Sequence, residues 1–125
     1  MAVSIEDQTV TAYQDAKAVV RSPIVTSAAT PTGTFHIQGK QPLVSAVYWS
    51  RSGSRRAEAG SLPDWMAFSG DAALQAAPWR TVFGSAGATI QPAYAPSTPR
   101  SIDLPPAVAR KLFGWASIGT EVVIY

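Results

Sequence analysis

The chain has 125 residues, of which 46% are hydrophobic and 14% are charged, and its formal net charge is +2. This composition is typical of one folded domain with a single core, residues 1–125, and it excludes a disordered chain. The basic residues are scattered apart from one cluster, Arg51, Arg55 and Arg56. They lack the basic face interleaved with aromatic residues that is typical of nucleic-acid binding.

Targeting and redox signals are sparse in this sequence. No apolar run reaches the roughly 20 residues that span a bilayer, and the N-terminal region lacks the apolar stretch of a signal peptide. The chain has no cysteine, which excludes disulfides and thiolate metal sites but leaves the compartment undecided. The sequence has no cluster of histidine and carboxylates of the kind that binds a metal ion, so we expect neither a metal nor another cofactor.

The first third of the chain predicts strands. β-Branched residues alternate with other residues over 9–13, and a hairpin connection at 14–17 leads into a second strand over 18–26. Pro23 removes a backbone donor from that second strand, so we expect the strand to lie at a sheet edge or to be bulged. Residues 34–38 predict a further strand with Phe35 and Ile37 on one face.

The middle of the chain predicts less regular structure. Residues 43–49 can form a strand, whereas residues 50–61 are small and polar and predict a mobile surface loop. Residues 84–98 are rich in Gly, Ala, Ser and Pro and predict a long loop with one short strand at Thr89 and Ile90. A loop of that length in a compact domain usually carries a function or its remnant, so residues 84–101 are the candidate functional loop.

The C-terminal region predicts one helix and one strand. Pro105 and Pro106 suit a first helical turn. Val108, Leu112 and Trp115 then form an apolar stripe at helical spacing. We expect Gly114 to terminate this helix. Residues 121–125 are nearly all apolar, which predicts a central strand. The sum is a mainly β domain with one short C-terminal helix followed by a final core strand.

Several segments, taken together and in order, resemble the L,D-transpeptidase catalytic domain, also called the YkuD domain. They are residues 30–35 (TPTGTF), 63–70 (PDWMAFSG), 77–80 (APWR), 102–105 (IDLP) with the helix after them, and 119–124 (GTEVVI). The resemblance covers nearly all of the chain. It implies a β-sandwich that in the family carries acyl transfer through a cysteine thioester.

The resemblance also implies where the family's catalytic residues would fall. The family's nucleophile loop reads Ser-His-Gly-Cys-(Ile/Val)-(Arg/Asn)-Leu, and a second His-Gly lies upstream. When the two sequences are anchored on Ile102 and Leu104, the nucleophile falls on Ser101, and the histidine and glycine before it fall on Pro99 and Arg100. The basic residue falls on Asp103, and the upstream histidine falls on Gln75. None of these five positions keeps the family's residue, so residues 84–101 resemble a remnant active-site loop.

Each replacement removes a chemical capability. A serine hydroxyl needs an adjacent base to act as a nucleophile, and Pro99 offers neither a base nor an N–H. Arg100 replaces a residue that lets substrate approach the backbone, and Asp103 reverses the charge beside a developing oxyanion. The sole histidine, His36, is expected at the surface or rim, and it could serve Ser101 only from within hydrogen-bond reach.

The sequence therefore predicts a non-catalytic L,D-transpeptidase-like module, not an enzyme. Its expected role is that of a structural or protein-interaction subunit of the cell envelope or of a larger assembly, bound to another protein or to a second copy. One alternative is a peptidoglycan-binding pseudoenzyme, and another is a residual acyl-transfer or hydrolytic enzyme using Ser101. Trp79, Tyr94 and Arg100 are the candidate binding residues. The resemblance suggests a bacterial cell-envelope or extracellular location.

Overall fold

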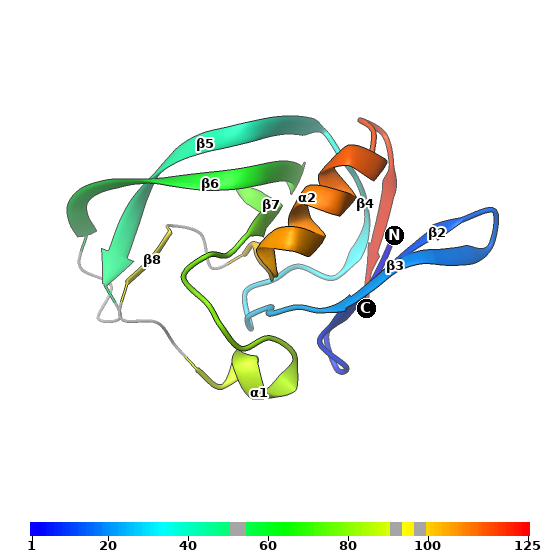
Figure 1. Ribbon diagram of the computed structural model, residues 1–125, viewed down its shortest axis with the longest axis horizontal. Coiled ribbons are helices and arrows are strands. Elements are labelled where there is room, and N and C mark those ends of the chain that lie inside the picture. The colour runs from blue at the N-terminus through cyan, green and yellow to red at the C-terminus, as the bar shows by residue number, and fades with distance from the viewer. Residues whose placement is uncertain (51–54, 91–93, 97–99) are drawn as a thin grey trace.

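Two five-stranded sheets and two helices make up the part of the chain that the structure describes. The computed structural model describes the backbone of residues 1–50, 55–90, 94–96 and 100–125, and the side chains of residues 1–44, 61–90 and 100–125. The helices are α1 (Ser85–Ala88) and α2 (Pro106–Trp115). Figure 1 shows α2 lying across the second sheet and α1 apart from both sheets at the bottom of the view.

The first sheet has the order β3-β2-β1-β10-β4. Its strands are β1 (Ala2–Ser4), β2 (Thr9–Gln14), β3 (Lys17–Pro23), β4 (Gly33–His36) and β10 (Glu121–Ile124). Strand β10 runs parallel to β1 and antiparallel to β4 and has buried Val122 and Ile124, so the prediction of a central final strand is confirmed. Strand β3 lies at the sheet edge and Pro23 is its last residue, as its missing N–H required.

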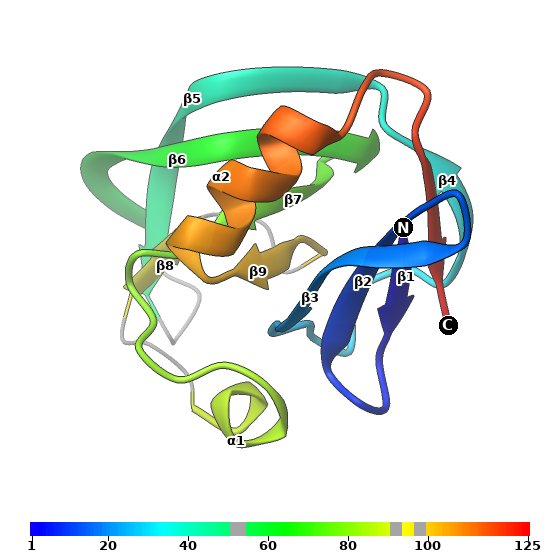
Figure 2. The same cartoon turned by 45° about the vertical axis from the view of Figure 1, so that its right-hand side comes forward.

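The second sheet has the order β8-β5-β6-β7-β9. Its strands are β5 (Gly39–Ser50), β6 (Arg55–Ser69), β7 (Ala72–Ala76), β8 (Tyr94–Pro96) and β9 (Ile102–Leu104). Strands β5 and β6 form a long antiparallel pair, and β7 and β9 run parallel to each other. Figure 2 shows β9 between α2 and the hairpin of β2 and β3.

The core lies where the two sheets and α2 meet. Helix α2 buries Ala109 and Leu112 and contacts β6, β7 and β3. On β4 the expected face is confirmed, because Ile37 just after the strand is buried and the Phe35 ring packs 5.4 Å from that of Phe68. Fully buried side chains from both sheets complete the core: Val3, Val10, Met66, Phe68, Leu74, Ile102, Leu104 and Ile124. The buried stripe of α2 confirms the predicted helix.

Three local predictions are wrong. Residues 55–61 of the expected loop 50–61 belong to β6, because the small residues pair with β5, for example Gly60 with Ala46; residues 51–54 lie outside the described residues. Thr89 ends α1 instead of forming a strand, since local turn hydrogen bonds from its N–H and hydroxyl to Ala86 O replace a ladder. Helix α2 runs past Gly114 to Trp115, and the Lys40 ammonium donates to Ala116 O just after the helix.

Candidate functional site

Strands β7 and β9 bring together two of the positions to which the resemblance assigns catalytic residues, Gln75 and Asp103. In their parallel register Gln75 lies opposite Asp103, between the pairs Leu74–Ile102 and Ala76–Leu104. The other edge of β9 is held by Val25, whose N–H donates to Asp103 O at 2.9 Å and whose carbonyl accepts from Asp103 N at 2.8 Å. Strand β9 is therefore paired on both of its edges, with β7 on one side and Val25 on the other.

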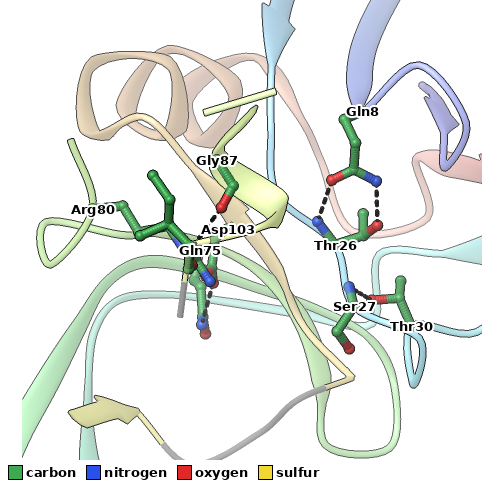
Figure 3. Close-up of polar contacts among 9 residues, drawn as sticks. Gln8, Thr26, Ser27, Thr30, Gln75, Arg80, Gly87 and Asp103 are labelled. Carbon is green, nitrogen blue, oxygen red and sulfur yellow. Dashed lines mark hydrogen bonds and ion pairs between the residues drawn. The ribbon is translucent and has the colours of Figure 1, made fainter. Parts of the chain in front are cut away.

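The Asp103 carboxylate has a cationic partner from the segment after β7. Arg80 Nε donates to Asp103 Oδ2 at 2.8 Å, and the two side chains are only 14% and 15% exposed. Gln75 Nε2 donates to the other oxygen, Oδ1, at 3.3 Å. Figure 3 shows Arg80 and Gln75 converging on Asp103. The acid at position 103 is thus neutralised within the fold.

Burial dominates the electrostatics of this acid. Loss of water around the carboxylate raises the pKa of Asp103 above its usual value, although Arg80, Gln75 and Trp79 all oppose that rise. Two buried polar atoms beside it, Gln75 Oε1 and Trp79 Nε1, have no hydrogen-bond partner among the described residues. A polar group buried without a partner is costly.

Arg80 also shapes a small hollow. Its Nη1 donates to Ile90 O at 2.9 Å and to Gly87 O at 3.4 Å, so one guanidinium joins β9 to the α1 segment. The hollow has a volume of about 100 Å³ and is lined by Trp79, Arg80, Thr81, Val82 and Ile90. Val82 and Ile90 are exposed at its rim. The hollow combines an apolar wall with one charged side chain.

The Ser101 hydroxyl is used inside the fold. Ser101 is 5% exposed, and its Oγ accepts a hydrogen bond from Ala73 N at 3.1 Å. Among the described residues, this is the one hydrogen bond of the Ser101 hydroxyl, and no titratable side chain is bonded to the hydroxyl. His36 is exposed on β4 at the edge of the first sheet, whereas Ser101 precedes β9 in the second sheet. The expected surface position of His36 is confirmed.

The remaining candidate residues lie in different settings. Arg100 Nη1 donates to Asp71 Oδ1 at 2.6 Å and to Ser69 O at 3.3 Å, so it is tied to the turn between β6 and β7. Trp79 is half-buried and lines the hollow. Pro99 and the side chain of Tyr94 lie outside the described residues, although Tyr94 begins β8.

Sequence reasoning missed Arg80 as a site residue. Two features of the sequence could have indicated it: Arg80 directly follows the Ala-Pro-Trp segment, and Asp103 stands on a short apolar strand. A buried acid needs a counter-charge, and Arg80 could supply it. Among the described residues, no group of three or more His, Asp or Glu side chains could hold a metal ion. No helix in the described part of the chain is long and apolar enough to cross a membrane.

The family model of the L,D-transpeptidase catalytic domain (YkuD) matches residues 1–124. The chain belongs to this family. Curated proteins gave no significant match to the sequence. The family assignment confirms the resemblance on which the expected fold rested, and the two sheets with one C-terminal helix confirm the mainly β fold class.

Solved structures of the family share this fold. A cysteine-to-serine mutant of the Enterococcus faecium L,D-transpeptidase superposes with a TM-score of 0.81 at 23% identity, over 99% of this chain and 48% of that one. The isolated E. faecium catalytic domain gives 0.74 at 22% identity, over 99% and 94% of the two chains. An L,D-transpeptidase from Mycobacterium smegmatis gives 0.74 at 22% identity, over 99% and 57%. The chain thus spans about half of the longer relatives and nearly all of an isolated catalytic domain.

Proposed function

We propose that this domain is a non-catalytic member of the L,D-transpeptidase family that serves as a structural or protein-interaction module. The observation that carries the proposal is the Ser101 hydroxyl, which is buried and accepts a hydrogen bond from Ala73 N. The resemblance to the family assigns the nucleophile's position to this serine. A hydroxyl in that position needs a base beside it, and its hydrogen bond goes to a backbone amide instead.

The cluster around Asp103 supports the same proposal. Gln75, at the position of the upstream histidine, donates its amide to Asp103, and an amide cannot exchange protons as an imidazole does. Asp103 is paired with Arg80, so the charges that meet here neutralise each other. A site of this kind offers no activated nucleophile. Family membership supports a place in the cell envelope, where another protein or a second copy is the favoured partner.

The test of inactivity is covalent acylation. One solved relative, the E. faecium catalytic domain, is described as acylated by ertapenem, and another as a carbamoyl enzyme formed with avibactam. Intact-protein mass spectrometry after incubation with each compound is expected to find no adduct on this chain, with the E. faecium domain as the positive control. An adduct that disappears in the Ser101→Ala variant would show instead that Ser101 is a working nucleophile.

The partner requires separate measurements. Light scattering coupled to size-exclusion chromatography reports self-association, and sedimentation with purified peptidoglycan sacculi reports the alternative of peptidoglycan binding. For the interaction module we expect a homo-oligomer or a stable protein complex and no retention on sacculi. Retention that is reduced by Trp79→Ala, with the exposed Gln38→Ala variant unchanged, would favour the peptidoglycan-binding alternative.

A further inference from the structure

The first sheet has a core face and an outer face. On the core face Val10 and Val122 are buried in one cluster with Leu112 of α2. Phe35 of β4 points to the same side, where its ring packs against that of Phe68 on β6. Helix α2 and β6 are the elements that contact this sheet most from outside it, and both lie on the core face. The residues that alternate with the buried ones therefore form an outer face turned away from α2 and β6.

One row of side chains crosses the outer face from edge to edge. From β3 to β4 the strand register places these residues opposite one another in turn: Arg21, Thr11, Ala2, Val123 and Thr34. Residues that are directly paired point to the same side of a sheet, so all of them share one face. The three inner side chains are small, and Ala2 and Val123 are only half-buried. The middle of the row is thus flat enough for a second sheet to pack on it.

Two opposite charges stand on this face at separate places. Arg21 is exposed on β3, which is an edge strand. Glu121 is exposed on β10 and precedes Val123 by two residues, so its side chain is on the same face. Three strand spacings, roughly 14 Å, separate the two strands across the sheet. Within the described part of the chain neither side chain has a hydrogen bond or an ion pair.

We propose that the outer face of the first sheet is a self-association surface on which a second copy of this chain docks face to face. The inference rests on the proposed function, because it names the partner of the interaction module. A surface that carries one positive and one negative side chain is complementary to itself. A partner surface of a single sign of charge would match only one of the two.

Two-fold symmetry makes the two charges meet. In a two-fold dimer both copies use the same patch, so a residue that contacts a second residue is contacted by it in return. An axis that exchanges the positions of Arg21 and Glu121 sets each arginine against the glutamate of the other copy. Both ion pairs then form at once, with Ala2 and Val123 between them. Tyr13, which follows Thr11 by two residues on the same face and is 49% exposed, adds an aromatic contact of the kind enriched at interfaces.

Charge reversal tests this surface. Analytical ultracentrifugation measures the Kd of self-association for the wild type, Arg21→Glu and Glu121→Arg. Each single variant places like charges in both contacts of its own dimer, so its Kd is expected to rise at least about tenfold. When the two variants are mixed in equal amounts, each glutamate faces an arginine again. The mixture is therefore expected to form a heterodimer with a Kd close to that of the wild type.

The matched control is Arg110→Glu, which makes the same change of charge at an exposed position on α2. It is expected to leave the Kd unchanged. Thermal unfolding checks that each variant is folded. Should a reversal variant fail to fold, the milder Arg21→Gln and Glu121→Gln variants are each expected to raise the Kd about threefold.

A wild type that stays monomeric up to about 1 mM would overturn the proposal. A dimer whose Kd neither reversal changes, or a mixture that does not recover the wild-type Kd, would overturn it as well. None of these outcomes bears on catalysis, which the acylation experiment decides, so this inference and the proposed function fail separately.

Discussion

Asp103 and Arg80 lie 23 residues apart in the chain and form an ion pair of 2.8 Å with both side chains about 85% covered. Through further hydrogen bonds from Arg80 to Gly87 O and Ile90 O, this pair joins β9 to the segment of residues 84–90. The two charges are placed against each other inside the fold.

The pH dependence of stability reports the charge state of Asp103. Its pKa is raised in the folded state, so the native protein binds more protons than the unfolded chain just above the usual 3.8. The contribution of Asp103 to stability is therefore fully present below that value and is lost as the pH rises through the raised pKa. The free energy of unfolding of the wild type, minus that of Asp103→Asn, should fall as the pH rises from about 3.5 to about 7.

Urea denaturation of both proteins across this range provides the measurement, and other carboxylates cancel in the difference. A difference that grows with rising pH would mean that Arg80 outweighs burial and that the pKa of Asp103 is lowered.

A cysteine at position 101 tests whether the position that the resemblance assigns to the nucleophile is accessible. The chain has no cysteine, so Ser101→Cys carries a single thiol. Because Ser101 is 5% exposed, we expect a maleimide or a disulfide reagent to label the native variant at least about a hundredfold more slowly than the urea-unfolded one.

The matched control is Ser117→Cys, since Ser117 is exposed after α2 and its thiol should react at nearly the unfolded rate. Fast native labelling at position 101 would instead place that side chain in an open site.

Two glycine-to-alanine changes should shift stability in opposite directions. A Cβ on Gly87 would lie 2.3 Å from Val82 O, and that backbone cannot move cheaply, so Gly87→Ala should cost about 1–3 kcal/mol. A Cβ on Gly114 in α2 meets nothing within 4 Å, and alanine is the better helix former, so Gly114→Ala should add about 0.5–1 kcal/mol. Thermal and urea unfolding measure both. Equal effects would contradict the close contact at Gly87.

Gln8 is expected to be the most sensitive polar residue outside the candidate site. Its Oε1 accepts from Thr26 N at 2.9 Å, and its Nε2 donates to Ile5 O at 2.8 Å and to Thr26 Oγ1 at 2.6 Å. Figure 3 shows this side chain holding the segment at Thr26 from above. Gln8→Ala leaves the buried Thr26 N–H without a partner and should cost about 2–3 kcal/mol. The exposed Gln38→Ala is the control, and an equally small change in both variants would contradict this role.

Part of this protein could be predicted from sequence because the signals are local. Alternating residues at 9–13, the apolar stripe of α2 and the apolar end of the chain each predicted their element, and the central place of β10 followed from its composition. The segments that resemble the family also carried its fold. Local periodicity and propensity determine such features, since each depends on neighbours a few residues away.

The candidate site was decided only by the tertiary structure. Whether Gln75 meets Asp103 depends on the parallel register of β7 and β9, and a slip of β9 by one residue would turn the Asp103 side chain to the other face of the sheet. The pairing of Arg80 with Asp103 and the burial of Ser101 likewise arise from segments that are distant in sequence. The sequence alone, through its resemblance to the family, indicated which positions would carry the catalytic residues. Only long-range packing decided that Gln75 and Arg80 bind Asp103, because burial and charge pairing are properties of the assembled core.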